Sequence, residues 1–332
     1  MAAETSRWAA TAFAVFPCAG QARRDVRATR GLVSSRAMRV QMGAAGSRDL
    51  LVVGAGELGK RVGRLWKQHE ETSSARVVAV TKSNASHAEL RSYGLEAYTW
   101  EQYMAERDAA DPGLAFPYVL LSASFGAIAQ DPALVASALS QWDAASDGVF
   151  VYTSSTGVVA TGAKILEPGV VLDENAPLSE EPRAQKLAHI EHQVLQNAGC
   201  VARLAGLYTR TRGPHNFWVR AGKVDSSADC MINMVHYQDA ARYVTATLRK
   251  GEEARNKLLL VTSEALSRRE ICEAAIEKVP DLQPPAGAEM QYGPPAEAWE
   301  SRRVFSNDWT RQFLDGIEPL FPTYRDGLAW TE

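Results

Sequence analysis

The sequence has 332 residues, of which 46% are hydrophobic, and a formal net charge of −3 at pH 7. This length and composition suffice for a packed core and indicate one large domain or two unequal ones. No stretch reaches the roughly 18 consecutive apolar residues of a membrane span, and the four scattered cysteines (Cys18, Cys200, Cys230 and Cys272) argue against a disulfide framework or a zinc site.

The first 47 residues differ in charge from the rest of the chain. They contain seven arginines, no lysine and two acidic residues, a net charge of +5, which leaves −8 for the remainder. Such an Arg-rich, Ala/Ser-rich and acid-poor segment is typical of an organelle transit peptide. We expect a disordered chloroplast transit peptide over residues 1–47, with a mitochondrial leader or an untargeted disordered terminus as alternatives. The acidic remainder has no basic stripe, so nucleic-acid binding is not expected.

The first predicted element is a buried strand that leads directly into a helix. Leu50–Val53 is an uninterrupted apolar run, as expected of a parallel strand with both faces covered. After a short glycine-rich segment, a helix is predicted from Glu57, because apolar residues recur at helical spacing at Leu58, Val62, Leu65 and Trp66.

Three glycines lie between this strand and helix, in the arrangement of a dinucleotide-binding turn. Gly54 would allow the tight turn, Gly56 would let a pyrophosphate approach the backbone, and Gly59 would pack the helix against the strand. The free N–H groups of the helix N-terminus, near Glu57 and Leu58, would then face the phosphates. A tight strand–helix turn without a ligand is the alternative.

Strand-like and helix-like segments alternate after this unit, which predicts an α/β fold with a doubly wound parallel sheet. Ligands of such sheets bind beyond the carboxyl ends of the strands. At the end of the fourth strand, the small residues Ser122 and Ala123 would leave room for an adenosine and its ribose. The six predicted strands are Leu50–Val53, Arg76–Val80, Leu95–Tyr98, Tyr118–Leu121, Val149–Tyr152 and Val201–Leu204, and helices are predicted from near Glu57, Ser86, Glu101, Pro132 and Arg183.

The pattern becomes irregular after about residue 206. A helix near Tyr237–Leu248, a strand at Leu258–Val261 and a helix near Arg268–Lys278 are predicted among polar loops. We therefore expect a dinucleotide-binding Rossmann domain over residues 48–205, and a small C-terminal lobe over residues 206–332 that packs on it at the substrate side.

The second strand carries the signal for cofactor preference. An acidic residue about 20 positions after the glycines usually binds the ribose of NAD, whereas a basic residue suits the 2′-phosphate of NADP. Here Lys82 and Ser83 follow Arg76–Val80, with no acidic residue between them and the strand. We expect Lys82 and Ser83 to favour NADP, with Lys60 and Arg61 close by. NAD remains the alternative, and Lys82 would otherwise be an ordinary solvated lysine.

Five segments in the same order resemble the short-chain dehydrogenase/reductase superfamily, in particular its extended and atypical branches of NAD-dependent epimerase/dehydratase-like proteins. Together they span about residues 48–330. They are the glycine turn at 54–59, Tyr-Thr-Ser-Ser-Thr-Gly-Val at 152–158, Arg-Leu-Ala-Gly-Leu-Tyr at 203–208, Asn-Met-Val-His-Tyr-Gln-Asp-Ala-Ala at 233–241, and Phe-Pro-Thr-Tyr-Arg-Asp-Gly-Leu at 321–328.

The resemblance fails at the acid/base pair. The superfamily carries Tyr-x-x-x-Lys on the helix after the fifth strand, where the lysine lowers the pKa of the tyrosine that exchanges the proton. When that helix is aligned on Glu191, the tyrosine position holds Arg183 and the lysine position holds Leu187. No tyrosine lies between Tyr152 and Tyr208.

The resemblance implies four other candidate residues, each with a structural alternative. Ser155 corresponds to the substrate-orienting hydroxyl, although it would otherwise cap a strand end. Tyr208 would approach the nicotinamide as a catalytic group, or pack in the core. On the substrate side, Arg212 would bind a carboxylate or phosphate, and His236 would contact substrate or join a hydrogen-bond network at a helix start.

These features predict an NADP-dependent oxidoreductase that acts on a small carbonyl or hydroxyl substrate of unknown identity. The alternative is a catalytically inactive dinucleotide-binding protein, a redox sensor or assembly factor in the plastid. A usual sugar-nucleotide epimerase is disfavoured because that reaction relies on the missing tyrosine. The resemblance also makes a homodimer conceivable, and no metal ion is expected.

Overall fold

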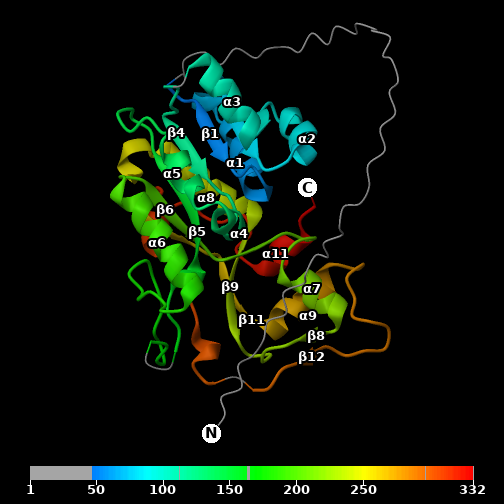
Figure 1. The fold of residues 1–332 in the computed structure, drawn as a ribbon. Helices are drawn as coiled ribbons and strands as arrows, with labels where there is room; N and C mark the ends of the chain where they lie inside the picture. The colour runs from blue at the N-terminus through cyan, green and yellow to red at the C-terminus, as the bar shows by residue number, and fades with distance from the viewer. Residues whose placement is uncertain (1–46, 112, 163–164, 296, 332) are drawn as a thin grey trace, which may run out of the picture. The chain divides into compact units, whose positions relative to one another are not determined.

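Seven parallel strands form the centre of the protein, for which a computed structural model describes residues 47–111, 113–162, 165–295 and 297–331. The strand order is β10-β6-β5-β4-β1-β2-β3, and Figure 1 labels β6, β5, β4 and β1 of this sheet. This arrangement confirms the predicted doubly wound parallel sheet and adds a seventh strand to it. The strands are β1 (Leu50–Val53), β2 (Val77–Thr81), β3 (Glu96–Thr99), β4 (Tyr118–Leu121), β5 (Phe150–Ser155), β6 (Cys200–Leu204) and β10 (Leu258–Val261).

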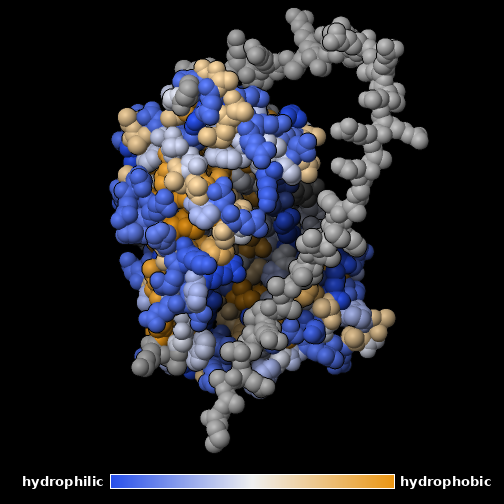
Figure 2. Space-filling view, in the orientation of Figure 1, coloured by the Kyte–Doolittle hydropathy of each residue, from blue (hydrophilic) through white to orange (hydrophobic). Residues whose placement is uncertain are grey.

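Helices cover both faces of the sheet because successive strand residues point to opposite sides. In β1, Leu50 and Val52 join one buried cluster, whereas Leu51 and Val53 join the other. Figure 2 shows mainly hydrophilic residues on the surface and hydrophobic ones in its hollows. The first cluster includes residues of α1 (Glu57–Gln68), α2 (His87–Ser92) and α8 (Tyr237–Arg249), and the second includes residues of α3 (Trp100–Ala110), α4 (Phe125–Gln130), α5 (Ala133–Leu139) and α6 (Pro182–Gln196).

A second, smaller layer is built from the C-terminal part of the chain. Its three-stranded sheet has the order β11-β9-β7, and it shares a buried cluster with three helices. The strands are β7 (Gly206–Tyr208), β9 (Met231–His236) and β11 (Glu264–Ser267), and the helices are α7 (Pro214–Ala221), α9 (Arg268–Lys278) and α11 (Tyr324–Ala329). The pair β8 (Lys223–Val224) and β12 (Gln291–Tyr292), and the helix α10 (Asp308–Phe313), complete this part of the chain.

Two elements expected in the C-terminal lobe lie in the main layer instead. β10 pairs with β6 at the edge of the large sheet, and α8 packs against α1. The reason is visible in β10, whose apolar run needs cover on both faces and obtains it only within the large sheet. The chain after residue 205 therefore contributes to both layers.

The predicted transit peptide lies outside the described residues except for Ser47, so it stays a prediction. In the part of the chain that the structure describes, no helix is both long and apolar enough to cross a membrane.

A buried ion pair fixes α6 to the sheet. Arg203 of β6 places Nη2 2.8 Å from Glu191 Oε2 and Nε 3.1 Å from Oε1, and the Ser154 hydroxyl donates to the same carboxylate at 2.5 Å. Both charged side chains are less than 5% exposed. Because Arg183, Leu187 and Glu191 are spaced by four residues, they lie along one face of α6. Anchoring Glu191 therefore also sets the position of the other two.

The ion pair makes stability sensitive to loss of either partner. Arg203→Met would leave the Glu191 carboxylate buried without its cation, and we expect the free energy of unfolding to fall by about 3–5 kcal/mol in urea titrations. Arg249→Met is the matched control, because Arg249 lies 3.7 Å from Glu71 in an exposed pair, where about 0–1 kcal/mol is expected. Similar losses in the two variants would contradict a special role for the buried pair.

Candidate functional site

A cleft of about 910 Å³ opens at the carboxyl ends of the main-sheet strands. Its volume lies within the ~300–1,000 Å³ typical of ligand sites. The cleft straddles the reversal of strand order between β1 and β4, where doubly wound sheets bind their ligands. Its lining includes residues 53–58, 80–83, 122–125, 152–155 and 204–207.

The glycine turn forms one wall of this cleft. Gly54 has φ +89°, and a Cβ there would lie 2.4 Å from Ala123 N, so only glycine fits. A Cβ on Gly59 would lie 2.9 Å from Gly54 O, which shows how closely α1 approaches the turn. Gly56 differs, because a Cβ added to it would have no atom within 4 Å. Gly56 therefore borders open space at the N-terminus of α1.

Ser122 and Ala123, at the end of β4, line the cleft and contact the glycine turn. The Ser122 hydroxyl donates to Gly54 O at 2.9 Å, and the Ala123 backbone touches the position where a Cβ of Gly54 would lie. These small residues hold the glycine turn against β4 without filling the cleft.

Glu57 and Leu58 begin α1 at the edge of the cleft. Glu57 forms ion pairs with Lys60 at 3.1 Å and Arg61 at 2.8 Å. Burial raises the pKa of this carboxyl group, but hydrogen bonds and charges from Lys60 and Arg61 outweigh burial and lower the pKa below its ordinary value. The carboxylate is therefore neutralised locally, at a helix end that attracts anions.

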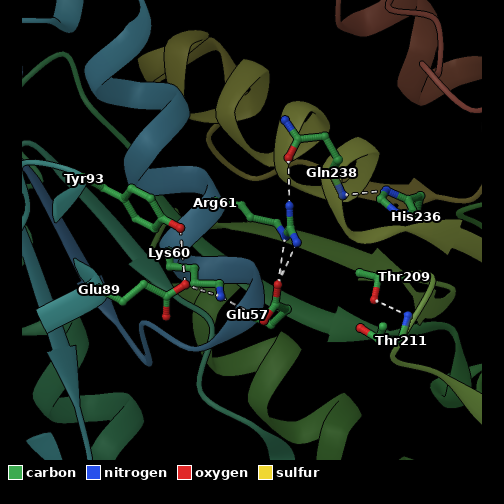
Figure 3. Close-up of polar contacts among 9 residues, drawn as sticks. All are labelled: Glu57, Lys60, Arg61, Glu89, Tyr93, Thr209, Thr211, His236 and Gln238. Carbon is green, nitrogen blue, oxygen red and sulfur yellow. Dashed lines mark hydrogen bonds and ion pairs between the residues drawn. The ribbon is translucent and has the colours of Figure 1, made fainter. Parts of the chain in front are cut away.

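The same network joins α1 to its neighbouring helices (Figure 3). Lys60 lies 2.8 Å from Glu89 of α2, and Arg61 Nη1 donates to Gln238 Oε1 of α8 at 3.2 Å. Lys60 and Arg61 were expected near a 2′-phosphate. The structure instead engages both with carboxylates of the helices, because they follow Glu57 at the (i, i+3) and (i, i+4) spacings that favour ion pairs.

Lys82 and Ser83 line the cleft beyond β2, as the sequence analysis placed them. The Lys82 ammonium donates to Gln130 Oε1 of α4 at 3.1 Å, and Ser83 O accepts from the Thr81 hydroxyl at 2.8 Å. No carboxylate follows β2 directly, since residues 81–83 are Thr, Lys and Ser.

Ser155 ends β5 and borders the cleft. Its Oγ accepts from Gly157 N at 3.1 Å, so the strand-end cap, the structural alternative for this residue, is present. The cap uses only an acceptor site of the hydroxyl, and the O–H proton remains able to donate. Capping and orientation of a ligand are therefore compatible at Ser155.

The two positions of the superfamily's acid/base pair also face the cleft, and they hold Arg183 and Leu187. The Arg183 guanidinium carbon lies 5.3 Å from the ring centroid of Phe125, at the start of α4. Arg183 was absent from the predicted site residues because a guanidinium cannot exchange a proton at physiological pH. Its alignment with the missing tyrosine was the signal that could have included it.

Only one of the three remaining predicted residues borders the cleft. Arg212 is exposed and lines it, whereas neither Tyr208 nor His236 is among its lining residues. Tyr208 is 1% exposed, its hydroxyl lies 3.4 Å from Tyr324 O, and burial strongly raises its pKa. This placement corrects the expected catalytic role of Tyr208, because its hydroxyl is sealed in the core.

His236 has a structural position. It caps α8 by accepting from Gln238 N at 3.1 Å (Figure 3), and its ring centroid lies 4.5 Å from that of Phe321. Burial, with a smaller effect of the Arg61 charge, lowers its pKa to about 4. His236 therefore belongs to the hydrogen-bond network at the start of α8, which was the alternative to a substrate contact.

The next residue, Tyr237, lines the cleft. It was not among the predicted site residues, although it belongs to the same sequence motif as His236.

Comparisons with solved structures give the class of fold. A nucleoside-diphosphate-sugar epimerase from Pseudomonas aeruginosa matches with a TM-score of 0.64 and 15% identity, over 84% of this chain and 94% of its own. MoeE5, solved in complex with UDP-glucose and NAD, matches with a TM-score of 0.62 and 16% identity, over 85% of this chain and 96% of its own. A functionally unknown conserved protein from Silicibacter pomeroyi has a TM-score of 0.61 and 18% identity, over 85% and 96%.

The chain therefore has the Rossmann fold of NAD-dependent epimerase/dehydratase-like proteins, as the resemblance implied. No family model matches the sequence, and no curated protein matches it at the sequence level. Fold alone does not determine function, so the activity has to be argued from the cleft. Within the described ranges, no three potential metal ligands cluster together.

The buried histidines predict a pH dependence of stability. Burial lowers the pKa of His236 and of His215 to about 4, below the unfolded value of about 6.5. The unfolded chain therefore binds more protons between these values, and the stabilisation is complete above pH 6.5 and declines as the pH falls toward 4. From pH 7.5 to pH 5 we expect a loss of about 2 kcal/mol per histidine in urea titrations.

His236→Asn isolates one contribution, because asparagine still caps a helix but does not titrate. The variant should lose about 2 kcal/mol less than the original protein over the same pH interval. An identical pH dependence in the two proteins would contradict the burial argument for His236.

Proposed function

We propose that this chain binds NADP in the cleft and acts as an oxidoreductase on a small carbonyl or hydroxyl compound. The observation that carries the proposal is the open space above Gly56, at the N-terminus of α1 and at the reversal of strand order. A phosphate can approach a backbone that has no Cβ, and the N-terminal N–H groups of a helix bind anions.

Further residues along the cleft fit the remaining parts of a dinucleotide. Ser122 and Ala123 leave space beside the turn, where an adenosine and its ribose would lie. Lys82 supplies a cation and Ser83 a hydroxyl after β2, at the position that discriminates a 2′-phosphate from a free ribose hydroxyl. The absence of a carboxylate at residues 81–83 supports NADP rather than NAD.

The chemistry on this chain differs from that of the usual superfamily members. When bound, the nicotinamide supplies or accepts the hydride, and the protein orients the reactants. Ser155 would donate a hydrogen bond to the substrate oxygen and orient it. Arg183 stays protonated and cannot act as a base, but it adds positive charge where the tyrosine would otherwise lie. In the reduction, the proton that the substrate oxygen gains would come from solvent, and in the oxidation it would return there.

A catalytically inactive dinucleotide-binding protein is the second candidate function. The replacement of both members of the acid/base pair, by Arg183 and Leu187, favours it. Such a protein would respond to the redox state of the cofactor or assist assembly of other proteins. The two candidates share the cofactor site and differ only in turnover.

The cofactor site predicts nucleotide affinities that calorimetric titration of the full chain can measure. We expect NADPH and NADP to bind more tightly than NADH and NAD. Lys82→Glu should weaken the phosphorylated pair by about 10- to 100-fold, because a charge-assisted hydrogen bond contributes about 1.5–3 kcal/mol. Lys223→Glu, an exposed lysine outside the cleft, should leave all four affinities unchanged.

Gly56→Val tests the phosphate approach within the same titrations. A Cβ at this position would have no protein atom within 4 Å, so the protein should fold and yet lose binding of all four nucleotides. If the unchanged protein binds none of them, the cofactor assignment fails and the Rossmann scaffold serves protein contacts instead.

Turnover separates the two candidate functions. For the oxidoreductase, we expect oxidation of NADPH in the presence of some member of a panel of small aldehydes and ketones, followed by absorbance. Ser155→Ala should lower kcat/KM by about 100-fold, the usual effect of losing one donor to the reacting oxygen. NADPH binding without oxidation across the panel would favour the inactive dinucleotide-binding protein.

A further inference from the structure

The two halves of the cleft differ in charge. In the half built from β5 onward, the charged lining residues among those described are Arg183 and Arg212. The acidic lining residues, Glu57, Glu101 and Asp131, all come from segments that precede β5. The half of the cleft that would face the substrate therefore carries positive charge alone.

Arg183 stacks on Phe125 and keeps its donors available. Its guanidinium lies over the Phe125 ring, with 5.3 Å between the guanidinium carbon and the ring centroid. Stacking engages the flat face of a guanidinium, whereas its N–H groups point outward in the plane. No carboxylate or carbonyl of the described residues accepts a hydrogen bond from the Arg183 side chain, and the same holds for Arg212.

The helix that carries Arg183 is anchored to the main sheet. Glu191, eight residues further along the helix, is bonded to Arg203 of β6 in the buried ion pair. Leu187 lies between them along the helix and presents an aliphatic side chain to the cleft where the superfamily has a lysine. Arg183 itself is exposed, as is Arg212, so both guanidiniums can be reached by an anion from solvent.

We propose that Arg183, together with Arg212, binds an oxyanion of the substrate, a carboxylate or a phosphate group. Arg183 is then a substrate-binding residue at the position that the superfamily uses for proton transfer. The inference deepens the proposed function and rests on it only for the identification of this anion with a substrate. Both guanidiniums offer the bidentate geometry that carboxylate and phosphate oxygens accept.

Ser155 completes the subsite. It lies at the end of β5, whereas Phe125 under Arg183 follows β4, and Arg212 follows β7 after β6. Ser155, Arg183 and Arg212 all line the same cleft. A substrate whose anion is held there would present its neighbouring carbonyl or hydroxyl group to Ser155.

The test uses inorganic phosphate and malonate as probes, titrated calorimetrically into the full chain at low ionic strength, where screening is weak. We expect binding of at least one anion, weakened at least tenfold by Arg183→Ala and by Arg212→Ala. Arg183→Lys should recover only part of the affinity, because lysine keeps the charge but lacks the planar fork. Arg220→Ala, an exposed arginine of α7 outside the cleft, should have no effect.

The outcomes separate the possible sources of the anion. Preference for phosphate or for malonate, lost with Arg183, would support the site and identify its group. No binding of either anion, or equal binding by Arg183→Ala and the unchanged protein, would overturn the proposal. A parallel NADPH titration gives a second check, since a tenfold loss of NADPH affinity in Arg183→Ala would assign Arg183 to the cofactor and overturn the substrate role.

Failure of the proposed function gives a different result. If the unchanged protein binds a probe anion through Arg183 but binds no dinucleotide, the cofactor assignment falls and the oxyanion site remains.

Discussion

The close approach of the Gly54 turn to the end of β4 is the constraint on which the rest of the structure depends. A Cβ at residue 54 would collide with the backbone of Ala123, so the chain can turn from β1 into α1 only with glycine there. The Ser122 hydroxyl then ties the turn to β4. This contact brings the helix N-terminus to the point where the strand order reverses. The cleft and its open space at Gly56 both lie at that placement.

Two side chains in the cleft differ from the pattern of the superfamily that the sequence resembles. The position that carries a tyrosine in the superfamily faces the cleft, but it holds an arginine stacked on Phe125. The lysine position holds Leu187, which has no positive charge to lower the pKa of a neighbouring hydroxyl group. A permanent cation suits binding and electrostatic stabilisation, whereas it is unsuited to proton exchange. The residues at these two positions therefore fit the proposed anion site better than proton exchange.

Neighbouring residues of one sequence motif can differ in whether they are buried or line the cleft. His236 and Tyr237 are adjacent in sequence, yet His236 caps α8 within an aromatic cluster and Tyr237 lines the cleft. Tyr208 likewise follows a strand of the expected motif, but the packing of Tyr324 and α11 encloses its hydroxyl. Burial shifts the pKa of Tyr208 and His236 away from neutrality, which suits structural roles better than proton transfer.

The sequence by itself determined the strands of the large sheet, the glycine turn and the fold class, because apolar runs, helical spacing and glycine positions act locally. It also predicted that Lys82, Ser83, Ser122 and Ser155 lie at strand ends, since those positions follow from strand boundaries alone. Only the tertiary structure decided that β10 and α8 join the main layer, that Lys60 and Arg61 are engaged by Glu57, and that Tyr208 is sealed while Arg183 faces the cleft. These outcomes depend on contacts between distant segments, and such contacts leave no periodic signal in the chain.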